Sequence, residues 1–181
     1  MKRWVTFFSQ TGNEIANIAN RLFHCPDVII TNKELIDGID NNLLKIGYNR
    51  MYFIPKKPTI EEYEAALEDA GVTPDNSVIT LHGYLRVLPS ELCKKYNIIN
   101  CHPALISHFP ELKGLDPQKR SLTYDFIGTT LHKVIAAVDE GDIISEKKIN
   151  NNFSSVEEII HVLKLESQKL WIELLLKELY N

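Results

Sequence analysis

Five short apolar runs, separated by segments with helical periodicity, constrain the fold of this chain more than any other feature. The runs are WVTFF (4–8), DVII (27–30), RMYFI (50–54), SVITLHG (77–83) and NIIN (97–100). One intervening segment shows its helical character clearly, because Thr59 and Glu62 form a capping-box pattern and Gly71 follows the last turn. Apolar strands that alternate with helices are typical of a mainly parallel sheet covered on both faces.

The last third of the chain has a different pattern. Residues 128–138 and 142–149 read as two β segments joined by a tight turn, DEGD, and residues 103–127 read as loop with one short helix near 118–125. A long amphipathic helix follows, capped near Ser154 or Ser155. We therefore predict a doubly wound, Rossmann-like α/β fold with helices on both faces, a β-hairpin extension and a long C-terminal helix.

Length and composition narrow the class of protein. With 181 residues, 44% of them hydrophobic, we expect one domain over 1–181. The net charge of -4 disfavours general binding to nucleic acid or anionic membranes, and the apolar N-terminal run ends at Ser9, too early for a signal sequence or membrane span. We expect a soluble cytoplasmic protein. The three cysteines Cys25, Cys93 and Cys101 lack CxxC spacing, so we expect reduced thiols and no metal.

Asn100 and His102 lie two residues apart at the end of the fifth apolar run. In an extended chain their side chains share one face and Cys101 lies on the other, which excludes a dyad of Cys101 with His102. An amide donor beside a titratable base suits acyl transfer, in which one group holds an oxyanion and the other moves protons. The alternative is that Asn100 caps the strand and His102 is a hydrogen-bonded, half-buried histidine.

Acidic residues crowd the turn VDEGD, which contains Asp139, Glu140 and Asp142. A carboxylate placed against His102 would raise the pKa of the imidazole and orient the ring. Such acidic turn residues are otherwise simply solvated. The sequence alone leaves both readings open.

Two further turns follow predicted strands. FSQTGNE, with Gly12, opens the first helix and is either a phosphate-binding turn or an ordinary cap; GxGxxG and Walker A patterns are absent from the sequence. HGYLRVLP contains Gly83, which permits close backbone approach, and Arg86, which either forms a structural ion pair or steers an anionic ligand.

Several of these stretches together resemble the folate-dependent formyltransferases, most closely those acting on phosphoribosylglycinamide. INCHPALISHFPEL resembles the family's N-x-H-P segment, and GTTLHKVIAAVDEGDII resembles its G-T-S-x-H segment with the later D-x-G. HGYLRVLP, ITNK and, more loosely, FSQTGNEI are similar to further family segments in the same order. The combination of the first two segments is specific, whereas either alone would be weak.

The resemblance implies roles for individual residues. The implied catalytic residues are Asn100, His102 and Asp139. The implied residues that bind 10-formyltetrahydrofolate are Arg86, Val87, Leu88, Ala136, Ala137, Val138 and Asp139. The implied substrate-binding residues are Gly12, Asn13, Gly83, Thr130, His132 and Glu166. No metal ligand, membrane or nucleic-acid polymer is implied.

The implied activity is transfer of a formyl group from 10-formyltetrahydrofolate to the primary amine of a small phosphorylated substrate, as in purine biosynthesis. Asn100 and protonated His102 would stabilise the oxyanion, and Asp139 would support the imidazolium and relay protons. The turn at 9–14 lacks one family glycine, and the loop 111–127 departs from the family pattern. Both changes lie on the amine side, so a sugar-nucleotide or other nucleotide amine is an alternative acceptor. Formyltetrahydrofolate hydrolase and a non-catalytic folate- or nucleotide-binding module are further alternatives.

Overall fold

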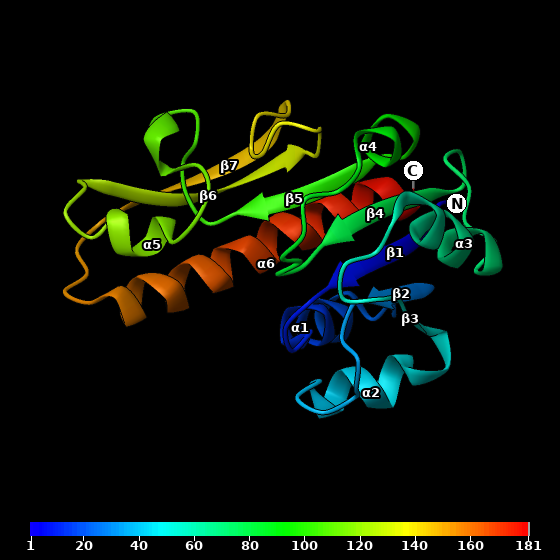
Figure 1. Ribbon diagram of the computed structural model, residues 1–181. Helices are drawn as coiled ribbons and strands as arrows, with labels where there is room; N and C mark the ends of the chain where they lie inside the picture. The colour runs from blue at the N-terminus through cyan, green and yellow to red at the C-terminus, as the bar shows by residue number, and fades with distance from the viewer. Residues whose placement is uncertain (181) are drawn as a thin grey trace.

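One seven-stranded sheet forms the centre of the molecule, with strand order β3-β2-β1-β4-β5-β6-β7 (Figure 1). The computed structural model describes residues 1–180. The strands are β1 (Arg3–Phe8), β2 (Val28–Thr31), β3 (Met51–Phe53), β4 (Ser77–Leu81), β5 (Ile98–His102), β6 (Phe126–Lys133) and β7 (Ile143–Asn150). Neighbouring strands from β3 to β5 are parallel, whereas β6 and β7 are antiparallel to their neighbours. The predicted mainly parallel α/β sheet with a hairpin extension is confirmed.

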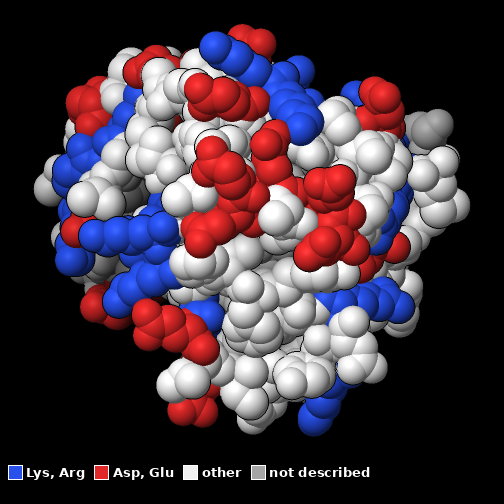
Figure 2. Space-filling model, turned by 45° about the vertical axis from the view of Figure 1, so that its right-hand side comes forward, with Lys and Arg blue, Asp and Glu red and all other residues white. Residues whose placement is uncertain are grey.

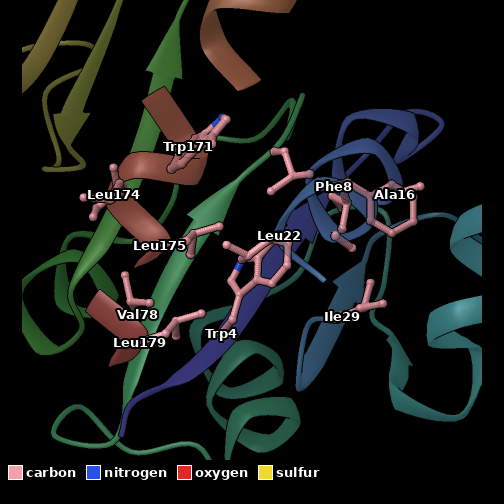
Figure 3. Close-up of a cluster of buried hydrophobic side chains, with 14 of the residues drawn as sticks. Trp4, Phe8, Ala16, Leu22, Ile29, Val78, Trp171, Leu174, Leu175 and Leu179 are labelled. Carbon is pink, nitrogen blue, oxygen red and sulfur yellow. The ribbon is translucent and has the colours of Figure 1, made fainter. Parts of the chain in front are cut away.

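Helices cover both faces of this sheet. They are α1 (Asn13–Leu22), α2 (Asn41–Gly47), α3 (Ile60–Asp69), α4 (Ser90–Lys95), α5 (Pro117–Arg120) and α6 (Val156–Tyr180), with 3-10 turns η1 (Tyr48–Arg50) and η2 (Pro110–Leu112). Trp4 and Phe8 of β1 pack against α1 and α6 on one face, and Figure 3 shows Trp171 and Leu175 of α6 in this cluster. Side chains of α3 and α4 cover the other face. Burial on alternate sides explains why β1 is apolar along its length.

The hairpin differs from its sequence-based prediction. Strand β6 ends at Lys133, and residues 134–142 form a loop instead of a β segment closed by a tight turn. The main-chain N–H of Lys133 donates to the carbonyl of Asp142, which closes this loop at the sheet. The apolar pattern at 134–138 was misleading because Ile135 and Val138 are exposed and do not fill a core.

Two short helices also differ from the expected elements. The helix expected near 118–125 covers only α5, after which Ser121 and Tyr124 form a turn. Helix α2 was not predicted, and it is capped by Asp40, whose carboxylate accepts from the main-chain N–H groups of Asn42 and Leu43.

The surface carries both signs of charge. On the face shown in Figure 2, acidic side chains gather near the centre and basic side chains lie mostly around them. No helix within residues 1–180 has the length and apolar character needed to cross a membrane.

Candidate active site

Strands β5 and β6 place four polar side chains on one face of the sheet. Asn100 pairs with His132 in the strand register, and His102 pairs with Thr130. Nδ2 of Asn100 lies 3.3 Å from Nε2 of His132. Cys101 points to the opposite face, where its Sγ lies 3.0 Å from Oγ1 of Thr129. Burial raises the pKa of the Cys101 thiol, so it is not a nucleophile beside His102.

The loop between β6 and β7 brings Asp139 against both histidines. One carboxylate oxygen lies 3.2 Å from Nδ1 of His102, and the other lies 3.4 Å from Nε2 of His132. The main-chain N–H of Gly114 also donates to Asp139, at 2.9 Å. Asp139 has a left-handed backbone, with φ 54°, and its side chain is only 8% exposed. The structure thus brings together Asn100, His102 and Asp139.

Burial and charge set the protonation of this cluster. Burial would raise the pKa of Asp139, but the hydrogen bond from His132, the charge of His102 and the Gly114 N–H lower it overall. Burial lowers the pKa of His102 more than Asp139 and the Leu112 carbonyl raise it. Asp139 raises this pKa, as expected of a neighbouring carboxylate, but desolvation of the ring outweighs the attraction and the pKa is lowered overall.

Hydrogen-bond partners constrain both imidazoles. Nδ1 of His132 lies 2.9 Å from the Lys133 carbonyl and donates there, whereas Nε2 accepts from Asn100 when the ring is neutral and donates to Asp139 when the ring is protonated. One N–H of the Asn100 amide is then available to another acceptor. Nε2 of His102 lies 2.9 Å from the Leu112 carbonyl, so both nitrogens of His102 face acceptors. Only the protonated ring of His102 donates to both.

A cavity of about 510 Å³, here called the Arg86 cavity, opens beside these residues. It is lined by Leu81, Tyr84, Leu85, Arg86, Val87, Leu88, Asn100, Gly114, Leu115, His132, Val134, Ile135, Val138 and Asp139. Nε of Arg86 is buried and has no hydrogen-bond partner among residues 1–180. The cavity therefore has apolar walls, a polar end and an unused donor. His102 does not line it and lies behind Asp139.

A second cavity, of about 360 Å³ and here called the Glu14 cavity, lies at the N-terminus of α1. It is lined by Gln10, Thr11, Gly12, Asn13, Glu14, His82, Gly83, Cys101, Pro103, Gln118, Thr129, Ile160, Leu163, Lys164 and Ser167. Gly12 has φ 70°, and a Cβ there would lie 2.3 Å from Cδ2 of Leu43, so this turn requires glycine. The two cavities lie on opposite faces of β4 and β5, because Leu81 and Asn100 line one while His82 and Cys101 line the other.

Some residues implied by the resemblance line neither cavity. Ala136 and Ala137 are exposed in the loop that carries Asp139. Thr130 is fully buried, and its hydroxyl lies 2.7 Å from the Ala104 carbonyl. Glu166 lies outside both cavities, and its carboxylate forms an ion pair of 2.6 Å with Lys169.

Sequence reasoning missed three charged or titratable residues of the Glu14 cavity. They are Glu14, His82 and Lys164. Two of these residues could have been found from their neighbours in the sequence. Glu14 directly follows Gly12 and Asn13, and His82 directly precedes Gly83, so each lies beside a candidate site residue. Lys164 lies on the long helix and had no such signal. Among residues 1–180, no group of three or more metal-ligating side chains is positioned to hold a metal ion.

The fold and these two cavities define an α/β protein with its site at the carboxyl ends of parallel strands. The sequence profile described as "Formyl transferase" matches residues 2–170. The chain therefore belongs to the formyl transferase family, which confirms the resemblance noted from its motifs.

Individual relatives agree with this assignment. Phosphoribosylglycinamide formyltransferase of Bacillus subtilis (strain 168) is 31% identical over 197 residues, which cover 99% of this chain and 95% of the relative. The protein of the same name from Dictyostelium discoideum is 28% identical, over 76% of this chain and 77% of the relative. A crystal structure of that enzyme from Campylobacter jejuni has a TM-score of 0.81 at 24% identity, covering 100% of this chain and 99% of that one, and it supports the fold.

Proposed function

We propose that this chain, as a single catalytic domain over residues 1–181, transfers a formyl group from 10-formyltetrahydrofolate to a primary amine. The observation that carries this proposal is the placement of Asn100, His132 and Asp139 at the wall of the Arg86 cavity, with His102 held behind by Asp139. The names of the Bacillus and Dictyostelium relatives favour phosphoribosylglycinamide as the amine substrate.

The Arg86 cavity suits the folate co-substrate. Its apolar walls, including Val87, Leu88 and Val138, would hold a flat heteroaromatic ring, and the buried Nε of Arg86 offers a donor that finds no acceptor within residues 1–180. The co-substrate supplies a formyl carbon that an amine can attack. Asn100 stands at the polar end of this cavity, where a free amide N–H would meet the oxyanion that forms on attack.

Proton transfer is assigned to His102 and Asp139. The lowered pKa of His102 keeps its ring neutral at neutral pH, so the ring can take up the proton that the attacking amine loses once Asp139, which lines the cavity, has relayed it. The carboxylate of Asp139 and the Leu112 carbonyl then stabilise the imidazolium. In the balanced step, the new C–N bond forms, the bond to the folate nitrogen breaks, and that nitrogen receives the proton.

Release of tetrahydrofolate can be followed by absorbance with a panel of phosphorylated amines. We expect release that depends on phosphoribosylglycinamide and a formylated amine as the second product. Preference for a sugar-nucleotide amine would reassign the acceptor, and amine-independent release would indicate a hydrolase. Folate binding without release with any amine would contradict the proposal and indicate a binding module.

A further inference from the structure

Glu14 presents a carboxylate to the second cavity, and no step of the proposed chemistry uses it. Its side chain is 23% exposed and lines the Glu14 cavity. Oε2 lies 2.7 Å from Nδ1 of His82, and Oε1 accepts from the hydroxyl of Ser167 at 2.9 Å. Each oxygen can accept a further hydrogen bond, so the fixed carboxylate can bind a ligand that carries donors.

His82 holds this carboxylate from a rigid position. The His82 side chain is fully buried, and its ring lies 4.7 Å from the ring of Trp171, centroid to centroid. Nε2 of His82 lies 3.0 Å from Oγ1 of Thr80, which in turn accepts from Nε1 of Trp4 at 2.8 Å. The carboxylate is thus tied to the core of the protein, which makes it a pre-organised acceptor.

Glu14 carries a negative charge at neutral pH. Burial would raise its pKa, but the hydrogen bond and charge of His82, the Ser167 hydroxyl and the charge of Lys164 lower it overall. Lys164 lines the same cavity, and its Nζ lies 3.0 Å from Oδ1 of Asn13 at the start of α1. The cavity therefore has a cationic side at Lys164 and an anionic side at Glu14.

We propose that Glu14 binds hydroxyl groups on the sugar of the amine substrate. This assignment rests on the proposed function. The reacting amine must reach Asn100 on the other face of β5, so Glu14 is left to accept from a different part of the substrate. A phosphate would be repelled by Glu14 and attracted by Lys164. The carboxylate therefore fixes the orientation of the substrate in the cavity.

The test compares wild type and Glu14→Gln with phosphoribosylglycinamide and with analogues that lack one ribose hydroxyl. Loss of the relevant hydroxyl should raise KM of the wild type about tenfold, because it removes a charge-assisted hydrogen bond. The same loss should raise KM of Glu14→Gln clearly less, because this variant already has a raised KM for the natural substrate. Glu157→Gln, at an exposed position of α6 outside both cavities, is the matched control and should behave as wild type.

Folding of each variant is checked by thermal melting. If Glu14→Gln does not fold, Glu14→Asp takes its place, since it keeps the charge for His82 but withdraws the carboxylate by one methylene. Absence of formyl transfer in the wild type would contradict the proposed function. The role of Glu14 alone would be overturned if Glu14→Gln and Glu14→Asp depended on the ribose hydroxyl as strongly as the wild type does. It would also be overturned if Glu166→Gln, and not a Glu14 variant, lost this dependence.

Discussion

The Arg86 cavity and the Glu14 cavity lie on opposite faces of the same two strands, yet they differ in how they are built. The first takes its lining mainly from loops that follow β4 and β6, and its walls are largely apolar. The second takes its lining from the turn before α1 and from one side of α6, and it carries the fixed charges of Glu14 and Lys164. In our proposal the first cavity binds the folate co-substrate beside the reacting groups, and the second determines which amine is bound.

The largest effect should come from the catalytic side. Asn100→Ala removes the only side-chain amide among the residues that line the Arg86 cavity, and we expect kcat to fall about 10²–10³-fold. The melting temperature should stay near that of wild type, with Asn20→Ala on the exposed side of α1 as control. Initial rates at saturating substrate measure the effect. A kcat within about threefold of wild type would remove Asn100 from the oxyanion site.

A charge deletion in the second cavity should affect only the amine substrate. We expect Lys164→Ala to raise KM for the phosphorylated amine about tenfold, since it removes a charge-assisted contact. KM for the folate should not change, and Lys177→Ala, exposed near the end of α6, is the control. Steady-state kinetics with each substrate varied in turn would show the split. An equal rise in both KM values would mean that the two cavities are not separate subsites.

A substitution in the apolar wall of the Arg86 cavity should affect KM for the folate and not KM for the amine. Val87 is 70% exposed in the free protein, so Val87→Asp should fold normally. The variant places a carboxylate where the folate ring would bury apolar surface, and we expect KM for folate to rise about tenfold. Calorimetric titration with a folate analogue measures this directly. Unchanged folate affinity would exclude Val87 from the binding surface.

The pH dependence should give the smallest effect. Because the pKa of His102 lies below its ordinary value of 6.5, the ring is mostly neutral at pH 6.5, and the acid decline of kcat/KM should be centred below that pH. In Asp139→Asn the carboxylate that raises this pKa is lost, so the residual activity should titrate at still lower pH. An NMR titration of the histidine signals identifies the group. An acid limb centred above pH 6.5 would contradict the assignment.

The sequence predicted the strands well and the loops poorly, for a physical reason. Buried strands reveal themselves through continuous apolar runs, and β1, β2, β4 and β5 lie within about two residues of the predicted runs. The apolar residues 134–138 imitate a strand, but they surround a cavity opening instead of filling a core. Contact between Asp139 and His102 depends on a left-handed residue in a long loop, which no local pattern specifies.

In the candidate site, too, residues on a strand were predicted, whereas features that depend on loops and long-range contacts were missed. Asn100 and His102 were found because a strand fixes the spacing of side chains that share a face. The effect of a carboxylate on the pKa of His102 was predicted, but the larger lowering by burial was not, because burial of the ring depends on how the loop around Leu112 packs over it. Glu14 and His82 were missed because their pairing joins α1 to the end of β4, two segments that are distant in the sequence.

The loop 134–142 contributes both to the wall of the Arg86 cavity and to the position of His102. Val138 lines the cavity proposed for the folate, and the next residue, Asp139, holds His102. A co-substrate that packs against Val138 would therefore contact the same segment that positions the proton-transfer group. Affinity and turnover would then be adjusted by the same stretch of backbone, and changes selected for tighter folate binding would alter the rate of the chemical step as well.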